Sequence, residues 1–270
     1  MNLKSTKYLI GCITLVLLQA CGSDSEYECL QPPQDGQILL FMDKSDSSTE
    51  QLLQSDSVFK SQLDRFLSTE LVNGYAIRGY FVHENTLGAT PFLDNQVKVP
   101  CPDIKGEDGF TRDNEQQKFV EAVQSGKIKA YQQVVSALQR SPDAQSQIQT
   151  DLWSSFELMS RYFSSGEAGA KKTVIYLSDM KESMPGEDRR DLHKALPKDR
   201  TEAETWAQQD AARIRERFKI EESALSDATV YLLFPVNQLE KGDIEVLRYY
   251  WETVFATFGI TELKETLVPG

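Results

Sequence analysis

The sequence contains little histidine, little cysteine and few basic residues, and each shortage excludes a class of function. Only 2 His and 4 Cys occur among 270 residues, and no two cysteines form a Cys-x-x-Cys pair. Zinc ribbons and thioredoxin-like redox sites are therefore excluded, and almost no material is left for a His-based zinc centre. With 29 Lys+Arg against 41 Asp+Glu, the net charge is −12, so the chain lacks the cations that would neutralise a run of nucleic-acid phosphates.

The motifs of several enzyme classes are missing as well. The chain has no Gly-x-Ser-x-Gly elbow of a serine hydrolase and no Gly-rich phosphate-binding loop. A phosphatase of the haloacid dehalogenase type needs a second aspartate two residues after the first, and here Ser45 occupies that place after Asp43. The overall composition, with 40% apolar and 26% charged residues, is ordinary for a soluble globular protein.

The first 20 residues have the features of a secretory signal peptide. Lys4 and Lys7 precede an apolar run over residues 8–18, which is too short to span a bilayer as a mature helix. The run Leu18-Gln19-Ala20-Cys21 then resembles the lipobox of bacterial lipoproteins. In that family the peptide is cut before the cysteine, which carries lipid. The alternative is an ordinary signal peptide with an incidental cysteine.

A lipidated Cys21 implies a protein held at a membrane of the bacterial cell envelope. Two or three acyl chains anchor a protein stably, whereas one chain binds only marginally. The next residue is Gly22, whereas an Asp at this position resembles an inner-membrane retention signal, so we expect the outer membrane, facing the periplasm. Residues 21–36 are expected to form a tether, and residues 37–270 a single domain.

The remaining cysteines agree with export. Cys12 leaves with the signal peptide and Cys21 carries lipid, which leaves Cys29 and Cys101 as a pair in an oxidising compartment. We predict a disulfide between them, worth roughly 4 kcal/mol of loop-closure entropy. The alternative is two free buried thiols.

Apolar strand patterns alternate with helical patterns along the mature chain. Strands are predicted at residues 38–42, 75–82, 173–177 and 228–234, with a short edge strand at 96–99. Helices are predicted at residues 52–67, 114–140 (in two pieces broken near Gly126), 152–163, 201–218 (opened by a Thr201–Glu204 capping box) and 243–258. This alternation predicts an α/β fold with a doubly wound, mostly parallel sheet flanked by helices.

Oxygen-bearing side chains follow two of the predicted strands. Asp43, Ser45 and Ser47 come directly after the first strand, and Asp179 follows the strand at 173–177. Thr150 precedes a helix. Since open α/β sheets bind ligands at the carboxyl ends of their strands, we expect these residues to converge. Carboxylates and hydroxyls suit Mg²⁺, Mn²⁺ or Ca²⁺, with Mg²⁺ the expected ion.

These residues resemble the metal-ion-dependent adhesion site of the von Willebrand factor type A (vWA) domain. That family has Asp-x-Ser-x-Ser after the first strand, a threonine in a later loop and an aspartate after the fourth strand, which Asp43, Ser45, Ser47, Thr150 and Asp179 match. The resemblance implies that the hydroxyls bind the metal directly, that the aspartates act largely through water, and that an acidic side chain of a partner completes the coordination. The sequence departs from the family at Gln149 and Met180, where glycine is usual.

The sequence therefore predicts a lipid-anchored envelope protein that uses a divalent metal ion to bind a protein partner, without turnover. A scaffold lipoprotein with a degenerate site is the alternative, and a metal-dependent hydrolase is a third. Asp43 is expected to lie outside the core, so that its replacement would leave the fold intact. The polar stretch from Met180 to Arg200 shows no core periodicity and is expected to be part of the partner surface or a solvated loop.

Overall fold

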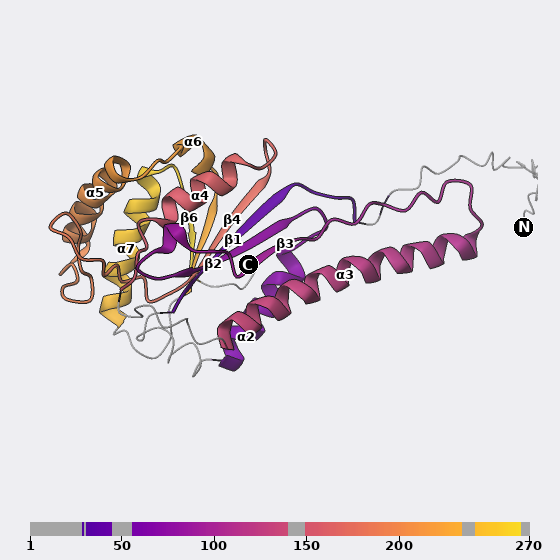
Figure 1. Ribbon diagram of the computed structural model, residues 1–270, viewed down its shortest axis with the longest axis horizontal. Coiled ribbons are helices and arrows are strands. Elements are labelled where there is room, and N and C mark those ends of the chain that lie inside the picture. Colours follow the sequence, from indigo (N-terminus) through magenta and orange to yellow (C-terminus); the bar gives the residue numbers. More distant parts are fainter. Residues whose placement is uncertain (1–28, 30, 45–55, 140–148, 234–240, 266–270) are drawn as a thin grey trace, which may run out of the picture.

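The computed structural model describes residues 29, 31–44, 56–139, 149–233 and 241–265. A sheet in the order β3-β2-β1-β4-β5-β6 runs through the described part of the chain (Figure 1). The strands are β1 (Gly36–Asp43), β2 (Ala76–Val82), β3 (Leu93–Gln96), β4 (Lys171–Leu177), β5 (Thr229–Leu233) and β6 (Glu262–Lys264). All neighbouring pairs are parallel except β2 with β3. The predicted doubly wound, mostly parallel fold is confirmed.

Helices cover both faces of this sheet. One face packs against α2 (Asp56–Glu70) and α3 (Gly109–Gln139), and the other against α4 (Ser155–Ser164), α5 (Arg200–Arg217), α6 (Glu222–Leu225) and α7 (Lys241–Thr257) (Figure 1). A short 3₁₀ helix, η1 (Thr86–Gly88), follows β2. Alternate residues of the fully buried strand β1 point to opposite faces of the sheet. Leu40 packs in the core on the α2–α3 face, and Phe41 packs in the aromatic core on the α4–α7 face.

The prediction that the helix over residues 114–140 breaks near Gly126 is wrong. Helix α3 is continuous over 31 residues and passes through Gly126. A Cβ at Gly126 would lie 3.1 Å from a methyl carbon of Val97, so the glycine allows the chain after β3 to pack closely on the helix. Glycine marks a close contact here rather than a helix end.

Two other local predictions are corrected by the structure. Helix α5 begins at Arg200, because Asp199 is its N-cap and accepts a hydrogen bond from the Glu202 backbone N–H at 2.9 Å. The capping box predicted from Thr201 to Glu204 is therefore two positions too late. The edge strand lies at Leu93–Gln96 rather than at 96–99, and the final strand β6 was not predicted.

The chain before β1 is fixed to the domain. Cys29 and Cys101 form the predicted disulfide, with their Cα atoms 5.9 Å apart. The Asn73 side-chain amide donates to the backbone carbonyls of Gln31 and Val99, at 2.9 and 2.8 Å. The last part of the predicted tether at 21–36 therefore belongs to the folded domain.

Among the helices that the structure describes, none combines the length and the apolar character needed to cross a bilayer.

Candidate metal centre

The two predicted aspartates lie at the topological switch point of the sheet, between β1 and β4. Strands β1 and β4 are parallel neighbours, and Met42 pairs with Leu177. Asp43 is therefore level with Ser178, and Asp179 lies one residue further on. The observed order 3-2-1-4-5-6 places its switch point between β1 and β4, where doubly wound sheets bind ligands outside the carboxyl ends of the strands.

Asp43 is fully buried, at 0% exposure, so the expectation that it lies outside the core is wrong. Its carboxylate accepts a hydrogen bond from the Ser178 hydroxyl at 2.7 Å. That hydroxyl in turn accepts from the Met180 backbone N–H at 2.9 Å. Asp43 thus connects the end of β1 to the turn that follows β4.

Asp179 is also buried, and it lies in a tight turn. Its carboxylate accepts from the Lys181 backbone N–H at 3.1 Å. Met180 has a φ of 60°, in the left-handed region that glycine adopts most readily. Its buried side chain and the hydrogen bond from Trp251 Nε1 to its carbonyl oxygen, at 2.7 Å, hold this conformation. Met180 therefore keeps a backbone geometry typical of the glycine that it replaces.

Thr150 carries a buried side-chain hydroxyl in the loop that precedes α4. Its hydroxyl is buried and has no hydrogen-bond partner among the residues that the structure describes. Its backbone N–H donates to the Ser183 hydroxyl at 2.7 Å, so the residue is tied to the segment that follows β4. Buried hydroxyls without a partner are uncommon, and a hard cation is one group that satisfies them. The chemistry of Thr150 fits the predicted metal.

Two predicted ligands, Ser45 and Ser47, lie outside the described residues. Within the described ranges, His, Cys, Asp and Glu residues form no group of three that could hold a metal ion. The structure thus brings the ends of β1 and β4, with Asp43 and Asp179, to one edge of the sheet and links Thr150 to the chain beyond β4.

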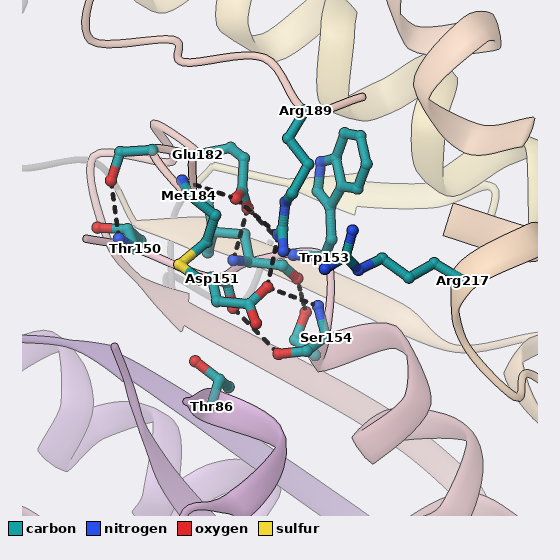
Figure 2. Close-up of polar contacts among 12 residues, drawn as sticks. Thr86, Thr150, Asp151, Trp153, Ser154, Glu182, Met184, Arg189 and Arg217 are labelled. Atoms are coloured by element: carbon teal, nitrogen blue, oxygen red, sulfur yellow. Dashed lines mark hydrogen bonds and ion pairs between the residues drawn. The ribbon is translucent and has the colours of Figure 1, made fainter. Parts of the chain in front are cut away.

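A buried ionic cluster, not foreseen from the sequence, lies beside Thr150. Arg189 donates to the carboxylates of Asp151, at 2.6 Å, and Glu182, at 2.7 Å (Figure 2). Its guanidinium also lies over the ring of Trp153, 4.8 Å from the centroid. Burial raises the pKa of the Glu182 carboxyl to about 8, against the opposing effect of Arg189. We name Asp151, Glu182 and Arg189 the edge cluster.

The stretch from Met180 to Arg200 is neither a solvated loop nor a wholly open partner surface. Met180, Glu182, Arg189 and Leu192 are buried within it. Their spacing matches no helix or strand, so periodicity could not reveal them. The one sequence signal was a set of isolated apolar residues, such as Leu192, within a polar segment.

The next residue, Arg190, belongs to a different cluster between α5 and α7. Its Nε donates to the Asp210 carboxylate at 2.8 Å. Asp210 also accepts from Arg213, at 2.8 Å, and from the Tyr250 hydroxyl, at 3.0 Å. We name Arg190, Asp210, Arg213 and Tyr250 the helix cluster.

The fold and the place of these residues resemble those of a vWA domain. Asp43 ends the first strand, Asp179 follows the fourth strand in chain order, and Thr150 lies in the loop that precedes α4. The assignment depends on this chain's own strand order and residues.

Comparisons with known proteins add fold neighbours. No protein-family model matches the chain, and no curated protein matches it. Among solved structures it is similar to BatB from Bacteroides thetaiotaomicron, with 13% identity over 85% of this chain and 89% of that one and a TM-score of 0.41. It is also similar to the pilus adhesin SpaC from Lactobacillus rhamnosus GG, with 11% identity over 89% of this chain and 29% of that one and a TM-score of 0.44. A third neighbour is proximal thread matrix protein 1 from the mussel byssus, solved with a zinc-occupied MIDAS motif, with 14% identity over 86% of this chain, 48% of that one and a TM-score of 0.35.

Proposed function

We propose that this vWA-like domain binds a divalent cation at the carboxyl edge of its sheet and uses the ion to bind a protein partner. Thr150, Ser45 and Ser47 would supply hydroxyl ligands, and Asp43 and Asp179 would supply carboxylates at the same edge. Mg²⁺ is the expected ion, and Mn²⁺ and Ca²⁺ are the other ions that prefer oxygen ligands.

The chemistry of this ligand set favours binding over catalysis. Neutral hydroxyl ligands leave a bound divalent ion with unneutralised charge, so the ion attracts an anionic ligand from outside the protein. An acidic side chain of a partner meets that need. A chain with a net charge of −12 would otherwise repel an acidic partner, and the ion offers one point of attraction.

One observation carries the proposal: the hydroxyl of Thr150 is buried without a partner in the described part of the chain, while the Thr150 backbone N–H bonds to Ser183 in the segment that follows Asp179. An unsatisfied buried hydroxyl costs about 1–3 kcal/mol, and a bound cation would remove that cost.

The test is thermal unfolding with EDTA and with millimolar Mg²⁺ or Mn²⁺. At a free ion concentration 100 times the dissociation constant, binding should stabilise the wild type by about 2.7 kcal/mol. Because Asp43 is buried, Asp43→Asn is a gentler probe than alanine: it keeps the side-chain shape and removes the charge. The matched control is Asp210→Asn, which makes the same change at another buried aspartate.

The control should retain the full metal-dependent shift, and Asp43→Asn should lose most of it. Equal shifts in wild type and Asp43→Asn, or no ion binding to wild type by calorimetry, would leave a scaffold protein without an adhesion site. A pull-down from envelope extract with and without EDTA would then test whether a partner depends on the ion.

We further propose that Cys21 anchors the protein to the outer membrane, with the domain in the periplasm. This proposal is supported by the lipobox-like run Leu18-Gln19-Ala20-Cys21 and by the disulfide, which is typical of exported proteins. Cys21→Ser should abolish acyl labelling and leave an uncleaved precursor. A membrane-bound, acyl-labelled variant of mature size would contradict it.

A further inference from the structure

The loop that carries Thr150 is held by one segment of the chain. Each residue from 150 to 153 bonds to a residue between 182 and 189, in the stretch that follows β4. We name residues 149–154 the Thr150 loop. Asp179 lies three residues before Glu182, so the chain that bears one candidate metal ligand also fixes the loop that bears another.

Ser183 binds the backbone of Thr150 itself. The Ser183 hydroxyl accepts from the Thr150 N–H at 2.7 Å, and the Ser183 N–H donates to the Thr150 carbonyl oxygen at 3.1 Å. Both backbone polar groups of Thr150 are thereby satisfied by one residue. Its hydroxyl is left free of these bonds, and its direction is set by the backbone that they fix.

Glu182 and Arg189 hold the rest of the loop. The Glu182 carboxylate accepts from the backbone N–H groups of Leu152, at 2.8 Å, and Trp153, at 3.2 Å. Arg189 joins Glu182 to Asp151, and Figure 2 shows the three side chains pointing toward one another beside Trp153. The Asp151 carboxylate also accepts from the Ser154 N–H at 3.1 Å, in the turn that leads into α4.

If the buried ionic groups of the edge cluster served only to stabilise the fold, they would do so inefficiently. The side chains of Arg189 and Glu182 are 1% and 0% exposed, and removing charges from water can cost more than their attraction returns. Apolar side chains of similar volume would often stabilise such a place as well or better. What ionic groups add is direction, because each bond fixes an atom of the Thr150 loop.

We propose that Ser183, Glu182 and Arg189 are positioning residues that hold the Thr150 hydroxyl in place for the metal ion. They act through the backbone of the Thr150 loop and do not bind the ion. This inference rests on the proposed metal site and adds that its affinity is set by residues outside the ligand set. Outer groups of this kind change metal affinity by about 10- to 100-fold when they are mutated in other metal sites.

The test compares Ser183→Ala with Ser160→Ala by Mn²⁺ titration calorimetry and by amide hydrogen exchange. The two serines are matched, because the Ser160 hydroxyl accepts from the Glu221 backbone N–H at 2.8 Å, in a part of the fold between α4 and α6. Ser183→Ala should weaken Mn²⁺ binding about tenfold and speed exchange at the amides of residues 150–153. Ser160→Ala should leave both quantities unchanged.

Glu182→Gln is the second variant, since glutamine keeps the shape but offers an N–H₂ group where one carboxylate oxygen was. It should weaken Mn²⁺ binding by at least as much as Ser183→Ala. Wild-type Mn²⁺ affinity in both folded variants, or equal weakening in Ser160→Ala, would overturn the positioning role. If wild type binds no Mn²⁺, the proposed metal site fails, and unchanged exchange at residues 150–153 would separately show that Ser183 and Glu182 do not hold the loop.

Discussion

Two neighbouring arginines enter two different buried clusters. Arg189 turns under the Thr150 loop into the edge cluster, whereas Arg190 turns toward α5 into the helix cluster. The edge cluster contains two carboxyl groups and one cation. The helix cluster contains one carboxyl group, two cations and the Tyr250 hydroxyl.

The two clusters also differ in their access to water. The Arg189 side chain is 1% exposed, while Arg190 and Arg213 are 22% and 38% exposed. The arginines of the helix cluster can keep water on one side, so their own desolvation costs little, although the Asp210 side chain between them is buried. The edge cluster is shielded from water and has more carboxyl groups than cations. The difference indicates that the helix cluster joins two helices, whereas the edge cluster fixes a loop at a cost in stability.

The largest effect is expected from Arg189→Met. It removes the one cation that contacts Asp151 and Glu182 in the described structure, and breaking a buried ion pair costs about 3–5 kcal/mol. Arg190→Met should cost about 1–2 kcal/mol, because Asp210 retains Arg213 and Tyr250. Urea unfolding of both variants measures the difference. Equal losses would show that the two clusters do not differ as described.

A smaller effect is expected from Asp210→Asn. Asparagine keeps an oxygen that can accept from Tyr250, so the loss should be about 1 kcal/mol from weaker bonds to the arginines. Mn²⁺ affinity should not change, because Asp210 itself bonds to Arg190, Arg213 and Tyr250 and to no residue of the Thr150 loop among the bonds described. A weakened Mn²⁺ affinity in this variant would mean that the clusters are coupled.

The two clusters can also be compared through a difference in pH dependence. Burial raises the pKa of Glu182 to about 8 from an ordinary value of 4.5, so the folded state binds a proton that the unfolded chain releases. This contribution to stability is complete below pH 4.5 and is lost as the pH rises through 8. Wild type should therefore lose stability relative to Glu182→Gln over this range, at up to about 1.4 kcal/mol per pH unit.

Other groups that titrate, including Asp210, are present in both proteins, so the difference between the two isolates Glu182. Burial raises the pKa of Asp210 as well, against the opposing effects of Arg190 and Tyr250. Parallel curves of unfolding free energy against pH for wild type and Glu182→Gln would contradict a raised pKa at Glu182.

The strands were predictable because the sheet is buried on both faces. Residues 38–42 and 173–177 are continuous apolar runs, which is what a central parallel strand requires, and they became β1 and β4. Asp43 and Asp179 could be placed at the carboxyl edge of the sheet because they follow those runs. Glu182 and Arg189 could not be found, since their roles come from a non-periodic segment that meets a loop about 30 residues earlier in the chain. Gly126 led to the wrong prediction of a helix break, because this glycine allows a close contact with Val97, which is distant in sequence.

The disulfide would have a mechanical consequence if the protein is anchored through Cys21 as proposed. A force that pulls on the chain before Cys29 is split at that residue between two covalent paths. One path follows the backbone toward β1, and the other crosses the disulfide to Cys101 and the chain that leads to α3. The path through β1 meets ladders of hydrogen bonds to β2 and β4 on both sides. Tension along the strand must shear both ladders together instead of opening them one bond at a time.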